Sequence, residues 1–112
     1  MLKTNDIAAI KRYLSHFDGV SVAFPYAKTL AVYSTANKVP FAYLEKGRQL
    51  PEISLRIDSQ LAQLLRDKYE EVTQGRKLDP RQWSTIVLSG QLSRDEINAL
   101  IDHSFQLASR LV

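Results

Sequence analysis

Five cations and one tryptophan, in two stretches of the 112-residue sequence, have the chemistry to bind an anionic chain. They are Lys46, Arg48, Arg76, Lys77, Arg81 and Trp83. Lysine and arginine contact phosphates without reading bases, and an indole ring can stack on a base. If the two stretches lie on the same side of the domain, the five cations flank one surface. This pattern predicts double-stranded DNA as a partner, bound weakly and largely without regard to its sequence.

The second stretch, QGRKLDPRQW (74–83), also has a purely structural interpretation. Asp79 can cap a helical turn that has Pro80 at its first position and Gln82 completing a capping box. Asp79 then offsets one of the nearby charges, and the cations are the solvated side of the turn. On this interpretation Trp83 is mostly buried and anchors the loop; on the other it is a stacking platform for a base. The sequence leaves both open.

The overall charge permits binding to a polyanion without requiring it. Fifteen basic and twelve acidic side chains give a net charge of +3, and the isoelectric point is near 9.3. So high an isoelectric point is typical of nucleic-acid-binding domains, but a small net charge is also common in soluble domains of this size. Lys28 and Lys38, in other turns, could extend the basic surface.

Residues that could support catalysis or hold a cofactor are scarce. The chain has no cysteine, which excludes a disulfide, a thiolate metal site and a cysteine nucleophile. Each of its four glycines stands alone, so no phosphate-cradling loop is present. The acidic pairs Glu70–Glu71 and Asp95–Glu96 fall at helix ends, where we expect them to be solvated. We therefore predict a protein that is not an enzyme and that has no metal and no cofactor.

Three amphipathic helices are expected to support these residues. Apolar residues three and four apart predict helices near residues 4–17, 58–71 and 93–110. Asp58 is placed to cap the second helix, and Ser93 with Glu96 forms a capping box at the start of the third. The buried stripes should consist of Ile7, Ile10, Leu14 and Phe17, then Leu61, Leu64, Leu65 and Tyr69, then Ile97, Leu100, Ile101, Phe105, Ala108 and Leu111.

Between the helices the hydrophobic repeat changes to the alternation of strands. The expected strands are 20–24, closed by Pro25, then 29–35, 39–45 and 52–57, a short one around Val72, and 83–89. The clearest is EISLRI, which should turn Ile53, Leu55 and Ile57 inward. Pro40 should lie near the start of its strand or on a sheet edge, because it cannot donate a ladder hydrogen bond.

The order of helix, four strands, helix, one or two strands and helix predicts a single α+β domain over 1–112. Strands joined by short turns imply a two-layer fold, a mainly antiparallel sheet of five or six strands with all three helices on one face. The other face would then carry Tyr33, Tyr43 and Thr85. If left open, it would suit a protein partner or a second copy of the chain. Protein–protein interaction is therefore the alternative function.

The N-terminal stretch MLKTNDIAAIKRYL interrupts every apolar run with a charge or an amide. It lacks the apolar core of a signal peptide, and no run approaches the roughly 20 residues that span a bilayer. We therefore expect a soluble cytoplasmic protein with no membrane partner.

Several of these segments resemble the MmcQ/YjbR family of small bacterial proteins. The resemblance rests on FAYLE (41–45), ISLRID (53–58), QGRKLDPRQWSTIVLSGQL (74–92) and LIDHSFQLASRLV (100–112), including the pair Ser104–Phe105. One departure is NKVPFA, where Val39 and Pro40 stand between Lys38 and the Phe-Ala strand, although family members usually have Gly-Lys directly before it. The resemblance implies an α+β fold of the secretion-chaperone-like and CyaY-like kind, and a suggested DNA-binding role through paired winged elements. The chaperone-like fold also points to the alternative function, a protein-interaction or chaperone-like module that uses the open sheet face.

Overall fold

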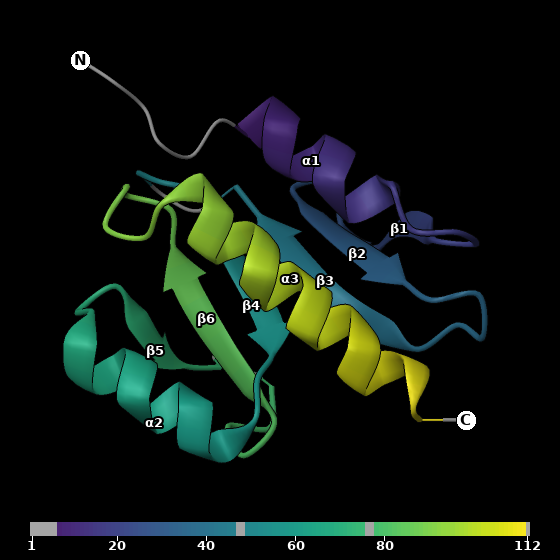
Figure 1. Ribbon diagram of the computed structural model, residues 1–112. Helices are drawn as coiled ribbons and strands as arrows, with labels where there is room; N and C mark the ends of the chain where they lie inside the picture. Colours follow the sequence, from purple (N-terminus) through teal and green to yellow (C-terminus); the bar gives the residue numbers. More distant parts are fainter. Residues whose placement is uncertain (1–6, 47–48, 76–77, 112) are drawn as a thin grey trace.

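The computed structural model describes residues 7–46, 49–75 and 78–111 (Figure 1). Its helices are α1 (Ile7–Ser15), α2 (Ser59–Lys68) and α3 (Arg94–Ser109). Its strands are β1 (Ser21–Ala27), β2 (Leu30–Ser34), β3 (Pro40–Glu45), β4 (Glu52–Arg56), β5 (Val72–Gln74) and β6 (Trp83–Val87). The order of elements is the one that the sequence predicts. Residues 4–6, the predicted start of the first helix, lie outside the described residues.

The strands form one antiparallel sheet in the order β1-β2-β3-β4-β6-β5. β4 begins at Glu52, which pairs with Glu45 of β3, and it ends at Arg56, which pairs with Trp83 of β6. We call these two limits the Lys46 end, because Lys46 follows Glu45 there, and the Trp83 end.

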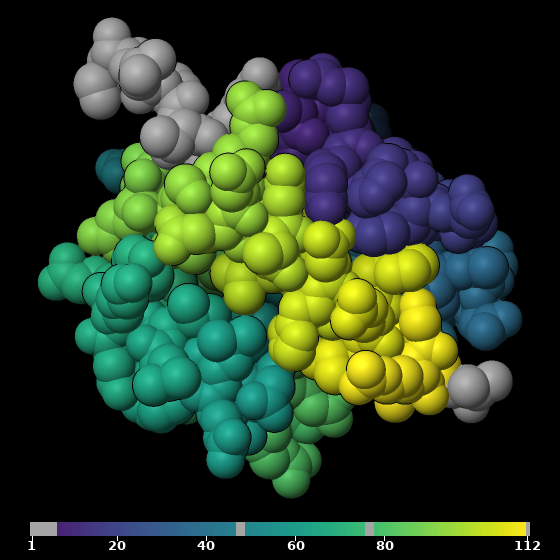
Figure 2. Space-filling view, viewed as in Figure 1, coloured from purple at the N-terminus to yellow at the C-terminus, as the bar shows by residue number. Residues whose placement is uncertain are grey.

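All three helices cover one face of the sheet, which confirms the predicted two-layer α+β fold (Figures 1 and 2). Local capping explains where two of them begin. The Asp58 carboxylate accepts the Leu61 amide at 3.2 Å, and the Ser93 hydroxyl accepts the Glu96 amide at 3.1 Å. The Glu96 carboxylate accepts the Ser93 amide at 2.8 Å in return, so the predicted capping box is present.

The core lies between the sheet and the three helices, α3 above all. Ile53, Leu55 and Ile57 are at most 2% exposed, as their alternation predicts. The Phe105 ring of α3 stacks on Phe17, with centroids 4.1 Å apart and planes 8° apart, and both rings meet Phe41 of β3 edge-on.

A buried serine ties the third helix to the sheet. The Ser104 hydroxyl of α3 donates to the Phe41 carbonyl of β3 and accepts the Arg56 amide of β4 at 2.8 Å. These bonds fix the backbone of Arg56 against α3 and so set the position of its side chain.

Three sequence predictions about burial and strand ends are wrong. Pro25 lies inside β1 and does not close it, because β1 is the edge strand and its pairing shifts between Ala23 and Ala27. Leu64 is 66% exposed, since at 100° per residue it points more than 100° away from the centre of the α2 stripe. Leu111 is 48% exposed because α3 ends at Ser109.

The face without helices is less open than predicted. Tyr33 is 4% exposed and belongs to the helix side of the sheet, and Thr85 is 2% exposed. Tyr43 remains partly exposed there, in a groove of about 510 Å³ that Tyr26 and Leu78 also line. No helix in the described part of the chain is long and apolar enough to cross a membrane.

Candidate nucleic-acid interface

The structure separates the two basic stretches that the sequence singles out. Arg48, Arg76 and Lys77 lie outside the described residues. Lys46 follows β3 at one end of the sheet, and Arg81 precedes Trp83 at the other. Lys46 and Arg81 therefore do not lie on the same side of the domain, as a single binding surface would require.

Arg81 belongs to a compact turn whose acid neutralises it. The Asp79 carbonyl accepts the amides of Gln82 and Trp83 at 3.1 and 2.9 Å, and the Asp79 carboxylate accepts the Arg81 amide at 3.0 Å. The same carboxylate pairs with the Arg81 guanidinium through two bonds of 3.1 Å. These bonds lower the pKa of Asp79 and raise that of Arg81. The capped turn is confirmed. The Gln82 side-chain oxygen, which was predicted to complete a capping box, instead accepts a hydrogen bond from Arg56 at 3.1 Å.

Trp83 is an anchor in this structure, as the structural interpretation predicts. It is 6% exposed, and its ring meets the Tyr43 ring edge-on with centroids 5.1 Å apart. The Gly75 amide donates to its carbonyl at 3.0 Å, and a Cβ on Gly75 would lie 2.8 Å from the Trp83 Cβ. The backbone segments at the two ends of the loop therefore contact each other at Gly75 and Trp83. The indole ring is buried and is not exposed for stacking on a base.

Arg56, which the sequence analysis does not single out, is the cation that Trp83 supports. Its Nε donates to the Pro40 carbonyl at 2.8 Å, its Nη1 donates to Gln82, and its Cζ lies 4.5 Å from the Trp83 ring centroid. These three partners are uncharged, so they orient the guanidinium without neutralising it. Burial lowers the pKa of Arg56, and the nearby Tyr43 opposes that shift.

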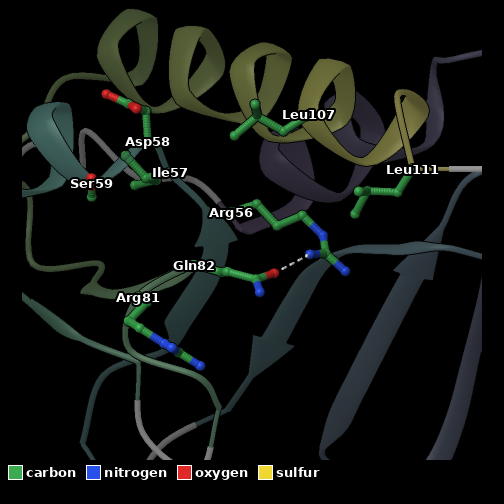
Figure 3. Close-up of a pocket in the computed structure, with 8 residues that line it drawn as sticks. All are labelled: Arg56, Ile57, Asp58, Ser59, Arg81, Gln82, Leu107 and Leu111. Carbon is green, nitrogen blue, oxygen red and sulfur yellow. Dashed lines mark hydrogen bonds between the residues drawn. The ribbon is translucent and has the colours of Figure 1, made fainter.

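A pocket of about 330 Å³ opens beside Arg56 (Figure 3). Arg81 and Gln82 line it from the turn, Ser59 from the start of α2, and Leu107 from α3. In Figure 3 the guanidinium of Arg56 extends from the end of β4 beneath α3, with Arg81 on the far side of Gln82. The pocket thus combines an oriented cation, a hydroxyl and an exposed second arginine.

Two further cations lie at the same end of the sheet. Lys38, in the turn between β2 and β3, has a left-handed φ of 68° and precedes by two residues the Pro40 carbonyl that Arg56 binds. Arg110 is the C-cap of α3, beside Leu111, which also lines the pocket. The turn that shares an end with the 75–82 loop is therefore 35–39, not 46–51. Lys28 lies in the β1–β2 turn at the Lys46 end, where Leu30 pairs with Glu45.

The carboxylate that lines the pocket already has a partner. Asp58 lines the pocket but caps α2, and its amide donates to His103 Nε2 at 3.1 Å.

Elsewhere, Glu71 is 8% exposed, which corrects the expectation that it is solvated. Its carboxylate accepts the Ser89 hydroxyl and the Leu92 amide, so it fastens the loop before α3. Among the described residues, no group of three or more acidic, histidine or cysteine side chains could hold a metal ion.

The signal that would have revealed Arg56 is the pairing of its strand. EISLRI places Arg56 on the outward side, opposite to Leu55. Only the antiparallel register of β4 against β6 shows that it faces Trp83. Pairing the end of the 52–57 strand with the start of the 83–89 strand would have predicted this contact.

Comparisons with known proteins agree with this fold. The YjbR family model matches residues 15–107. YjbR of Escherichia coli K12, a protein named as uncharacterised, is 36% identical over 74 residues. That match covers 66% of this chain and 63% of the E. coli protein, less than two thirds of its length. The YjbR of E. coli O157:H7 gives the same values.

Two solved structures share the fold. DR2400 of Deinococcus radiodurans, a DUF419 domain, superposes with a TM-score of 0.88 at 17% identity, covering 97% of this chain and 83% of its own. A structural-genomics target from Pseudomonas syringae gives 0.80 at 24% identity, covering 92% of this chain and 98% of its own. At these identities the similarity concerns the fold alone.

Proposed function

The chain belongs to the YjbR family, and we propose that it is a non-catalytic cytoplasmic protein that binds double-stranded DNA weakly, through phosphate contacts at the Trp83 end of its sheet. The observation that supports this proposal most is Arg56. Its guanidinium is oriented by a carbonyl, an amide and an indole face, and it borders an open pocket. A half-buried cation whose partners are uncharged is only partly solvated. An anionic ligand therefore stabilises it more than it would stabilise a fully solvated cation.

The surroundings of Arg56 suit an extended anion. The turn 35–39 with Lys38 and the loop 75–82 with Arg81 both extend from the Trp83 end, on adjoining parts of the sheet. The sequence of the second loop adds Arg76 and Lys77. Cations on two neighbouring hairpins can contact successive phosphates of a backbone. Such contacts position a protein on DNA without reading the bases, so the binding is indifferent to sequence.

The proposal assigns different roles to the residues that the sequence analysis grouped. Arg76, Lys77 and Arg81 contact phosphates, Arg56 is the oriented anchor, and Trp83 supports Arg56 from inside. Lys46 and Arg48 belong to a stretch that leaves β3 at the opposite end, so they are not required for the same contact.

The first experiment is a mobility shift of a random-sequence DNA duplex at several salt concentrations. About three neutralised phosphates give a slope of about −2.7 for log affinity against log salt. The variant Arg76→Ala/Lys77→Ala/Arg81→Ala should flatten this slope. A charge-matched control is Lys11→Ala/Lys28→Ala/Lys46→Ala, which removes the same charge on the other side of the fold and should leave the slope unchanged. Equal loss in both variants would show that total charge, not this site, governs binding.

A second variant should bind more tightly, which guards against loss by misfolding. Asp79→Asn removes the acid that neutralises Arg81 and keeps a side-chain oxygen for the Arg81 amide. Because Arg81 would then be free to pair with a phosphate, and an exposed ion pair is weak, the affinity for DNA at low salt should rise only about two- to fivefold. Unchanged or weaker binding would contradict a phosphate role for Arg81.

A further inference from the structure

A second groove lies on the helix side of the sheet, along its β1 edge, between α1 and β1. Ile7 of α1 forms one wall, Val22 and Phe24 of β1 form the other, and Ala31 and Tyr33 of β2 form the floor. Its volume is about 590 Å³. Val22 and Phe24 are 48% and 55% exposed, which is unusual for neighbouring large apolar side chains of one strand.

The groove lies beside α1, at the edge of the layer of helices. α1, α2 and α3 all lie on this face of the sheet (Figure 1), yet all seven residues of β1 are exposed. No helix in the described chain therefore buries the apolar side chains of β1. One further helix beside α1 would fill this position, because packed helices lie about 8–10 Å apart.

The charges around the groove specify what such a helix carries. Three exposed lysines line it, Lys11 from α1, Lys28 from the β1–β2 turn and Lys46 after β3, against the single acid Glu45. A partner with apolar residues on one face and carboxylates along the margins would match both the floor and the rim.

From these observations we propose that the groove between α1 and β1 binds an acidic amphipathic helix of another protein. This interface is separate from the DNA contact, since the groove runs along β1 to the Lys46 end and shares no lining residue with the pocket beside Arg56. A second copy of this chain fits less well, because a two-fold contact over the groove would place the three lysines against themselves. Pairing of β1 edges is opposed by Pro25 and by the shift in register beside it.

The probe is an 18-residue synthetic helix with leucine and phenylalanine at i, i+3, i+4 and i+7 and glutamate on its other faces. Its binding is followed by ¹⁵N–¹H NMR titration of the full chain. We expect shifts concentrated at Lys11, Val22, Phe24, Lys28 and Lys46. Two control peptides, one scrambled at equal composition and one with lysine replacing glutamate, should bind at least tenfold more weakly.

Three variants locate the contact. Phe24→Ala should abolish binding of the peptide and leave the melting temperature unchanged, since the ring is 55% exposed. Leu64→Ala, which removes a leucine that is 66% exposed on α2, is the matched control and should bind like the parent. Lys11→Ala/Lys28→Ala/Lys46→Ala should weaken binding about tenfold, because each exposed ion pair contributes a small factor.

The helix-partner proposal and the DNA proposal are tested by different variants, so one can be wrong while the other holds. Arg76→Ala/Lys77→Ala/Arg81→Ala should leave binding of the peptide unchanged whatever happens to DNA. Equal binding of the scrambled peptide, shifts outside the groove, or no binding would overturn the helix partner. So would shifts of the groove residues with sodium decanoate but not with the peptide, or self-association that Phe24→Ala abolishes.

Discussion

Replacing Trp83 with alanine should remove a large part of the stability of this fold. The indole is 6% exposed, its edge-to-face contact with Tyr43 has centroids 5.1 Å apart, and the Arg56 guanidinium lies 4.5 Å from its centroid. Truncating a buried tryptophan to alanine costs about 3–5 kcal/mol. The aromatic pair and the cation–π contact contribute about 1 kcal/mol each within that sum, so we expect about 4 kcal/mol.

Urea unfolding followed by far-ultraviolet circular dichroism measures this loss. The method does not depend on fluorescence, which Trp83→Ala abolishes. With a denaturant slope of about 2 kcal/mol per molar, a loss of about 4 kcal/mol lowers the urea midpoint by about 2 M. Trp83→Phe, which keeps a ring over Arg56, should lose less than half as much.

Two results would refute this reasoning. One is a free energy of unfolding for Trp83→Ala within about 1 kcal/mol of the parent. The other is a native emission maximum typical of indole in water, since a buried ring emits at shorter wavelength. Either would restore Trp83 as a residue presented to a ligand.

Three further predictions concern the loop, a helix cap and the response to alkali. Gly75→Ala should lower the free energy of unfolding by about 1–3 kcal/mol in urea titrations, because the added methyl would lie 2.8 Å from the Trp83 Cβ. Ser93→Ala removes the cap of α3 and should cost about 1 kcal/mol in the same measurement. The Tyr13 hydroxyl donates to Asp102 at 2.7 Å, and this bond raises the pKa of Tyr13 from 10.0 to about 12. Its stabilisation is complete below pH 10.0 and is lost as pH rises towards about 12, so the stability gap between the parent and Tyr13→Phe should close over that range.

The sequence predicts the elements of this fold well because each has a local cause. The Asp58 cap, the Ser93–Glu96 capping box and the alternation of Ile53, Leu55 and Ile57 all appear in the structure as expected. These features depend on residues a few positions apart. Periodicity and capping chemistry are sufficient to find them.

The site depends on contacts between distant strands, which local patterns do not contain. The pairing of Arg56 with Trp83 joins residues 27 positions apart and follows only from the register of β4 on β6. The separation of Lys46 from Arg81 has the same origin, because the direction of each hairpin decides at which end its loop emerges. Tyr33 was misplaced for a related reason: hydrophobicity shows that a residue can be buried but not which face of the sheet it joins. Leu64 differs, because its angle around the helix already separates it from the stripe.

The most direct test of the DNA proposal is the salt dependence of duplex binding, measured side by side for the parent and the two charge-matched triple variants. For the parent we predict a slope of about −2.7 for log affinity against log salt. The slope should become clearly shallower in Arg76→Ala/Lys77→Ala/Arg81→Ala, where Arg56 and Lys38 remain, and keep its parental value in Lys11→Ala/Lys28→Ala/Lys46→Ala. A parental slope in the first variant, or no DNA binding by the parent at low salt, would contradict the proposal.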